Sequence, residues 1–180
     1  MFGRKKPKSK RKDCIFRFEM NMCYKSILFI SLLFLGSCLK PPEYPVEPQI
    51  SFLSYSRDML IQNQFNTDSI LITIAFTDGD GDIGQDGGGF DLYLTDTRDN
   101  FMPPAYRLPK VPEQGTGNGI SGEISFVLYT TCCFFPDGQD PCTINPNFPE
   151  DTLSYLIYVK DRAGHQSNII ETPPIRLLCQ

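Results

Sequence analysis

The sequence predicts an all-β domain that folds as a two-layer sandwich. From residue 49 onward, apolar and polar side chains alternate in short stretches, and clusters of Gly, Pro, Asn and Asp separate these stretches. The stretches are rich in β-branched and aromatic residues, and none shows a convincing helical period. About seven strands over ~130 residues is the strand content of a sandwich.

Six segments are expected to form strands, in chain order 49–56, 68–78, 89–96, 122–131, 152–161 and 168–179. The second, fourth and fifth each carry a continuous apolar face, because side chains alternate along a strand. Those faces consist of Ile70, Ile72, Ile74 and Phe76; of Ile124, Phe126 and Leu128; and of Leu153, Tyr155, Ile157 and Val159. Pro173 and Pro174 interrupt the sixth segment. We expect an edge or a bulge there, because proline cannot donate to a strand ladder.

The first 37 residues differ from the rest and predict a cleaved signal peptide. Lys25 precedes an apolar run over 27–35, and small residues follow the run. The run is shorter than the ~20 residues that span a bilayer. Residues 1–19 are basic and lack an apolar period, so they either form a long n-region or lie upstream of a true start at Met20 or Met22.

Cys38 makes this leader more specific. The sequence Leu35-Gly36-Ser37-Cys38 resembles the lipobox of bacterial lipoproteins, which implies that the Cys38 thiol is acylated and that the chain is cut before it. An ordinary signal peptide that precedes a cysteine is the alternative. Several acyl chains hold a protein durably at a bilayer, and the Pro-rich residues 38–48 are expected to form a tether. The predicted location is the bacterial cell envelope, at the outer membrane, with its periplasmic or surface face left open.

Charge divides unevenly between the leader and the domain. The first 37 residues hold nine Lys and Arg against two Asp and Glu, and the remainder holds eight against 19, a net charge of −11. An acidic domain argues against a nucleic-acid partner, because binding phosphates requires a basic face. Cations are the more suitable partners.

Four cysteines remain after the leader and Cys38, namely Cys132, Cys133, Cys142 and Cys179. An even number in an exported domain favours disulfides over catalysis. Cys132 and Cys133 would point to opposite faces of a strand, so they are not expected to bond to each other. We expect one of them to pair with Cys142 inside an insertion at 131–150 and the other with Cys179. A zinc site is the alternative, although this spacing is unusual for zinc ligands.

The segment FTDGDGDIGQDGGGFD, residues 76–91, predicts a calcium-binding loop. Asp78, Asp80 and Asp82 occupy alternate positions, so their carboxylates can converge on one cation while the glycines permit the turn. The loop resembles the first half of an EF-hand, but position 12 is Gly89 and the flanking segments are strands. Calcium prefers all-oxygen shells, and we expect weak to moderate affinity. A solvated turn of Asp and Gly without an ion is the alternative.

The segment YLIYVKDRAGHQSNII, residues 155–170, resembles the last two strands of bacterial immunoglobulin-like domains, with His165 where asparagine is usual. Together with the lipobox, the tether and FTDGDGDIG, it looks like lipoproteins of the Bacteroidota type over most of residues 38–180. The resemblance implies an immunoglobulin-like sandwich over 49–180 and an envelope location, but no particular activity. In such a sandwich the loops after the second and sixth strands lie at one end. Asp161 would then join the aspartate loop, and Asp86 and backbone carbonyls could complete the shell.

These patterns predict a membrane-anchored, non-catalytic module that binds or assembles with an envelope protein or glycan. A purely structural envelope component is the alternative, and a carbohydrate-active or other hydrolytic enzyme is a minor one. His165 is the only histidine, and no nucleophile elbow accompanies it, so we expect a surface or supporting role. Aromatic residues of the insertion, Phe134, Phe135 and Phe148, either form a recognition surface or cap the sandwich.

Overall fold

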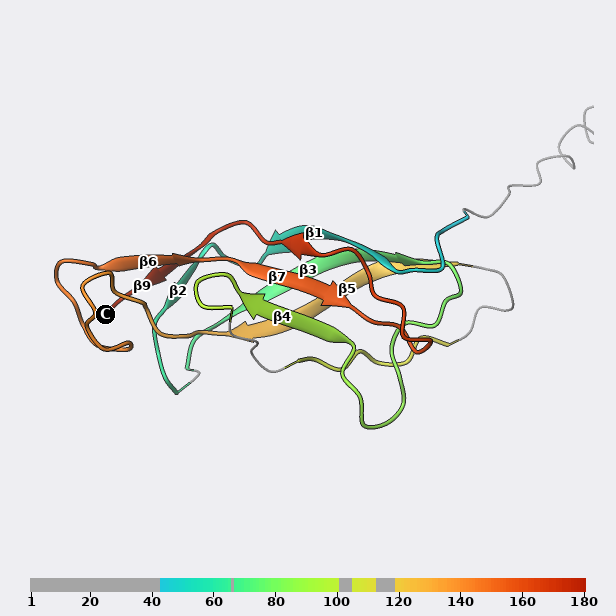
Figure 1. The fold of residues 1–180 in the computed structure, drawn as a ribbon, viewed down its shortest axis with the longest axis horizontal. Coiled ribbons are helices and arrows are strands. Elements are labelled where there is room, and N and C mark those ends of the chain that lie inside the picture. The colour runs from blue at the N-terminus through green and yellow to red at the C-terminus, as the bar shows by residue number, and fades with distance from the viewer. Residues whose placement is uncertain (1–42, 66, 101–104, 113–118) are drawn as a thin grey trace, which may run out of the picture. The chain divides into compact units, whose positions relative to one another are not determined.

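A computed structural model describes residues 43–65, 67–100, 105–112 and 119–180, which belong to one compact unit (Figure 1). These residues form an all-β fold of nine strands without a helix, as the sequence predicts. Consequently, no helix in the described part of the chain is long and apolar enough to cross a membrane. The predicted leader 1–37 and the lipidation site Cys38 lie outside the described residues.

The first sheet has the strand order β1-β3-β5 and contains the two longest strands. Its strands are β1 (Gln49–Tyr55), β3 (Ser69–Asp78) and β5 (Ile120–Tyr129), and both pairings are antiparallel. The register of β3 with β5 runs without a break from Ser69 opposite Tyr129 to Asp78 opposite Ile120. One end of β3 therefore lies beside the start of the cysteine insertion, and the other end begins the aspartate loop.

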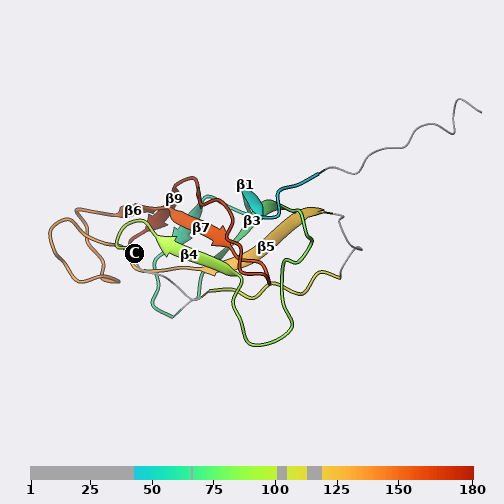
Figure 2. The ribbon, with the colours of Figure 1, turned by 45° about the vertical axis from the view of Figure 1, so that its right-hand side comes forward.

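Two smaller sheets lie across the core from the first. One has the order β4-β7-β8, from β4 (Leu92–Asp96), β7 (Tyr155–Val159) and β8 (Ile170–Glu171). The other has the order β2-β9-β6, from β2 (Met59–Ile61), β9 (Ile175–Leu178) and β6 (Glu150–Leu153). β4 and β7 run side by side as an antiparallel pair (Figure 2).

The same two stretches of chain run through both smaller sheets, one as β6 and then β7 and the other as β8 and then β9. Only Ser154 separates β6 from β7, and only residues 172–174 separate β8 from β9. Thr172 bridges this gap, since its N–H donates to the Tyr155 carbonyl at 2.9 Å and its Oγ1 accepts the Tyr155 N–H at 3.0 Å. The interruption at Pro173 and Pro174 is the break that the sequence predicts. The short strand β2, which pairs parallel to β9, was not expected.

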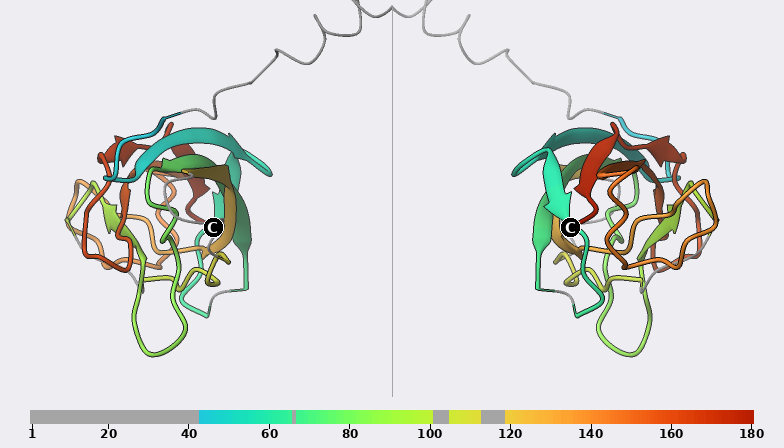
Figure 3. Two further views of the ribbon diagram at one scale, coloured as in Figure 1. Left: turned by 90° about the vertical axis from the view of Figure 1, so that its right-hand side faces the viewer. Right: turned by 90° about the vertical axis from the view of Figure 1, so that its left-hand side faces the viewer.

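The core lies between the inward faces of the strands, which surround it in the end-on views of Figure 3. The predicted faces of β3 and of the β6 to β7 segment are buried throughout, whereas Leu71 on the opposite face of β3 is exposed. On β5, Phe126 and Leu128 are buried and Ile124 packs against the core. Each fully buried aliphatic or aromatic side chain stabilises the fold by about 1.5–3 kcal/mol.

The described part of the expected tether lies against the domain. Pro48 is buried, and a Cβ on Gly79 would lie 2.5 Å from the carbonyl oxygens of both Tyr44 and Pro45. A Cβ on Gly119 would lie 2.7 Å from the Tyr44 ring. Residues 44–48 thus follow the surface beside the end of β3, because glycines on the domain leave room for this close approach.

Two disulfides fix the insertion, and the structure decides which cysteines pair. Cys132 is bonded to Cys142 within the insertion, and Cys133 is bonded to Cys179 just after β9. The expectation of one bond to each partner is confirmed. Cys133 and Cys179 are both buried, whereas Cys132 and Cys142 are partly exposed.

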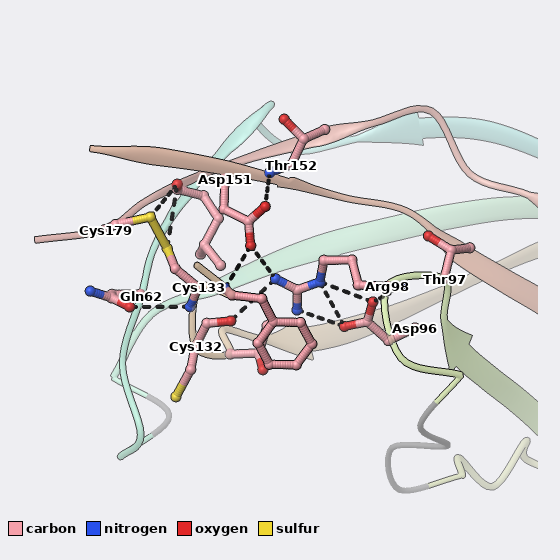
Figure 4. A network of polar contacts seen from close by, with 12 residues as sticks. Gln62, Asp96, Thr97, Arg98, Cys132, Cys133, Asp151, Thr152 and Cys179 are labelled. Atoms are coloured by element: carbon pink, nitrogen blue, oxygen red, sulfur yellow. Dashed lines mark hydrogen bonds and ion pairs between the residues drawn. A yellow bond between two sulfur atoms is a disulfide. The ribbon is translucent and has the colours of Figure 1, made fainter. Parts of the chain in front are cut away.

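An arginine that the sequence did not single out holds the same region (Figure 4). The Arg98 guanidinium lies between two carboxylates, with its Nη2 2.6 Å from Asp96 and its Nη1 2.7 Å from Asp151. Nη1 also donates to the Cys132 carbonyl at 3.2 Å, and the guanidinium lies 4.5 Å from the centre of the Phe134 ring. The insertion is therefore tied to the end of β4 by charge as well as to β9 by sulfur.

Candidate metal centre

The aspartate loop starts at the last residue of β3 and turns back on itself. Its turn is local, since the Asp78 Oδ2 accepts the N–H groups of Asp82 at 2.8 Å and Ile83 at 3.2 Å. Gly81 has φ +72° and Gly84 has φ +75°, a left-handed conformation that glycine adopts without steric cost. Gly81 provides this conformation between Asp80 and Asp82, and Gly84 provides it just after Asp82.

A second loop, after β7, supplies Asp161. Its carboxylate is fully buried and accepts from His165 twice, with Oδ1 2.8 Å from the backbone nitrogen and Oδ2 2.9 Å from Nδ1. The two loops are joined directly. The Ala163 N–H donates to Asp82 Oδ2 at 3.0 Å, and Arg162 Nη1 donates to the Gly84 carbonyl at 2.7 Å.

Four predicted ligand residues come together where these loops meet, at the right-hand end of the domain in Figure 1. Carboxylate oxygens of Asp78, Asp80, Asp82 and Asp161 all lie within 4.8 Å of one another. Calcium binds oxygens at 2.3–2.6 Å, so two ligands on opposite sides of one ion are about 5 Å apart. Four oxygens within 4.8 Å of one another are therefore close enough to contact a single ion of that size.

Two of the carboxylate oxygens in this cluster have no protein partner. Asp78 Oδ1 and Asp82 Oδ1 are buried and accept no hydrogen bond from any described residue. A buried charged oxygen without a partner is costly, because it has lost its hydration and gained nothing in exchange. A bound cation would satisfy both oxygens. In a turn whose carboxylates all faced water, no oxygen would be left without a partner.

The cluster raises the pKa of its own carboxyl groups. Burial, together with the charges of Asp80, Asp82 and Asp161, raises the pKa of Asp78 to about 6. Burial and the Asp161 charge likewise raise the pKa of Asp82. Both shifts report that negative charge is unfavourable here in the absence of a compensating ion.

Asp86, the fifth predicted ligand, lies apart from the other four. Its carboxylate is 81% exposed and 3.4 Å from the Lys110 ammonium. Its neighbour Gln85 bonds to the buried Asp91 at 2.8 Å. His165, for which the sequence predicted a supporting role, contacts the cluster through Asp161.

The three aromatic residues of the insertion divide between the two expected roles. Phe135 is buried and Phe148 packs against the core, as expected for side chains that cap the sandwich. Phe134 is exposed beneath Arg98, and Ile144 on the same insertion is exposed as well. The insertion thus both closes the core and presents apolar side chains to solvent.

Comparison of the chain with protein-family models, with curated proteins and with solved structures finds no match.

Proposed function

We propose that this protein is a calcium-stabilised, non-catalytic binding module of the bacterial cell envelope. One observation carries the calcium site: four carboxylates converge within 4.8 Å, and two of their buried oxygens lack a partner. Calcium suits the cluster better than magnesium does, because magnesium demands a near-ideal octahedral shell and dehydrates reluctantly. Backbone carbonyls and water would complete the six to eight oxygens that calcium takes.

An immunoglobulin-like arrangement of the sandwich is part of the proposal. The antiparallel order β1-β3-β5 corresponds to strands A, B and E of such a domain. The antiparallel pair of β4 with β7, and the hairpin from β6 and β7 to β8 and β9, correspond to strands C, F and G. In this assignment the aspartate loop follows strand B, and the loop that holds Asp161 follows strand F at the same end of the domain.

Anchoring to the outer membrane through an acylated Cys38 completes the proposed location. The lipobox supports it, and so do the two disulfides, which form and persist in oxidising compartments. A rigid insertion that exposes Phe134 and Ile144 favours a binding role over a purely structural one. Its partner would be an envelope protein or a glycan that contacts apolar groups.

The calcium site is tested by melting the purified protein in calcium and in chelator. We expect calcium to stabilise the fold by ~2.7 kcal/mol at a hundredfold excess over the dissociation constant. Asp80→Asn should abolish most of this gain, because it removes one of the four carboxylates, and it should still fold because Asp80 is exposed. Asp86→Asn is the matched control and should keep the full gain. Equal melting in calcium and chelator would contradict the proposal.

Binding by the insertion is tested by crosslinking in intact envelopes. Ile144→Ser and Phe134→Ser should lose a discrete partner that the unmodified protein captures, while the calcium-dependent melting stays unchanged. Leu53→Ser changes a residue of similar exposure on β1 and serves as the control. A partner captured equally well by all variants would show that the insertion is not the recognition surface.

A further inference from the structure

A second donor set overlaps the carboxylate cluster. Asp80, Asp161 and His165 each offer a ligand atom, and these atoms also lie within 4.8 Å of one another. Asp80 and Asp161 belong to both sets, whereas Asp78 and Asp82 belong only to the all-carboxylate set. The loops therefore provide either four oxygen donors or two oxygens with one imidazole nitrogen.

The contact between His165 and Asp161 is close to the spacing of two ligands on one small ion. His165 Nδ1 lies 2.9 Å from Asp161 Oδ2. Neighbouring ligands of a tetrahedral zinc ion, each about 2.1 Å from the metal, are about 3.4 Å apart. A metal could thus replace the shared proton after the two ligand atoms move about half an ångström apart and the imidazole turns toward the ion.

The imidazole can also be reached from outside. The His165 side chain is 38% exposed, although its Asp161 partner is fully buried, and Asp80 is exposed. An incoming ion would meet His165 and Asp80 first. Thiolates in the described residues do not compete for it, because the four cysteines there are in disulfides.

Imidazole changes which ions the site prefers. Calcium takes oxygen ligands, whereas imidazole favours zinc and other late transition metals over calcium and magnesium. The partnerless oxygens of Asp78 and Asp82 independently indicate that this place needs a cation. The four carboxylates would remain a source of attraction for any dication, whichever donor set finally holds it.

We propose that Asp80, Asp161 and His165 bind a transition-metal dication such as Zn²⁺, in exclusive competition with calcium at the neighbouring carboxylates. The proposal rests on the calcium function above, because the two ions share Asp80 and Asp161. Exchange between the ions would make the end loops of the domain sensitive to which dication the envelope supplies.

Two variants separate the donor sets. His165→Asn removes the imidazole and keeps a side chain that can hydrogen-bond to Asp161, so zinc affinity should fall about tenfold or more. Calcium affinity should change little in this variant. Asp78→Asn should have the opposite effect, a large loss of calcium affinity with zinc affinity retained. Titration calorimetry of the purified protein with Ca²⁺ alone, with Zn²⁺ alone and with Zn²⁺ after calcium saturation measures the calcium affinity, the zinc affinity and the competition between the two ions.

Several results would overturn the proposal. Zinc affinity that is unchanged in His165→Asn would place the ion elsewhere. An equal loss of zinc and calcium affinity in that variant would also contradict separate donor sets. Zinc that binds without displacing calcium would refute the shared site. Calcium binding without any zinc binding would refute this proposal and leave the calcium function standing, whereas an absence of binding by either ion would refute both.

Discussion

The two ends of β3 differ in whether the carboxylates near them are paired with a positive charge. Beside Ser69, the carboxylates of Asp96 and Asp151 flank the guanidinium of Arg98, and disulfides hold the surrounding chain. Beyond Asp78, four carboxylates face one another, and two buried oxygens have no partner. One end is thus compensated from within the chain, and the other leaves two buried oxygens that a cation from solution could satisfy.

This difference separates what is permanent in the domain from what responds to its surroundings. A charge pair within the chain and covalent bonds act at any calcium concentration. On the proposed function, the aspartate end should gain or lose stability with the cation and with pH, because both change the net charge of the two loops. Substitutions at each end test this difference, and their expected effects on stability range from about 5 kcal/mol to about 1 kcal/mol.

Arg98→Met should cause the largest loss. It leaves the buried Asp96 and the partly buried Asp151 beside an apolar side chain, and removing one member of a buried charge pair costs about 3–5 kcal/mol. Urea unfolding with an unchanged m-value measures the loss. Arg176→Met removes an exposed partner of Glu150 instead and should change stability little. Similar effects in the two variants would mean that the Arg98 network is no stronger than a surface pair.

The two disulfides should differ in their contribution. Cys133–Cys179 closes 46 residues and Cys132–Cys142 closes 10, so chain entropy predicts losses of about 4 and about 3 kcal/mol when each pair is replaced by alanine. Calcium-dependent stabilisation should persist in both variants, because the metal centre lies at the far end of β3. Loss of the calcium response in either variant would show that the two ends are coupled.

Without a dication, the aspartate end should become less stable as pH rises. The folded-state pKa of Asp78 is raised from its ordinary 3.8 to about 6, so its contribution is fully present below pH 3.8 and is lost as pH rises through about 6. In chelator, the melting temperature of Asp78→Asn relative to the unmodified protein should therefore rise by a few degrees between pH 4.5 and 7. In saturating calcium the relative change should reverse, because calcium binds the deprotonated carboxylates.

The unmodified protein has to be compared with the Asp78→Asn variant, because other carboxyl groups increase stability as pH rises. Burial opposes the shift, but backbone hydrogen bonds and Arg57 together lower the Asp68 pKa, and hydrogen bonds from Asn145 and Gln139 lower that of Asp137. Both groups stabilise the fold more as pH rises from the acid range. A pH profile that is identical in Asp78→Asn and the unmodified protein would contradict the role given to Asp78.

Gly79→Ala should have the smallest of these effects on stability. Its new Cβ would lie 2.5 Å from the carbonyl oxygens of Tyr44 and Pro45, and overpacking of this kind costs about 1–3 kcal/mol. The strain can be relieved if residues 44–48 move away, so we expect faster hydrogen exchange in that segment. Gly88→Ala has open space around its Cβ and is the control. Unchanged exchange in Gly79→Ala would show that the segment is held by other contacts.

Local patterns in the sequence predicted the strands and their buried faces. Ile70, Ile72 and Ile74 occupy alternate positions and are all buried, because alternate side chains of a strand point to the same face. The glycines between Asp78 and Asp82 similarly announced a tight turn. The three-residue strand β2 escaped notice, since so short a segment carries no period and forms only because β9 lies beside it.

The sequence by itself determined the features that depend on neighbours along the chain, namely the longer strands, their buried faces and the acidic turn, and its four remaining cysteines predicted two disulfides. Only the tertiary structure decided that Cys133, rather than Cys132, bonds to Cys179, and that Arg98 lies between Asp96 and Asp151. It also placed Asp86 in solvent beside Lys110, although spacing alone had grouped it with the ligands. The physical reason is the same in each case, because such partners are chosen by the path of distant segments, which no local pattern records.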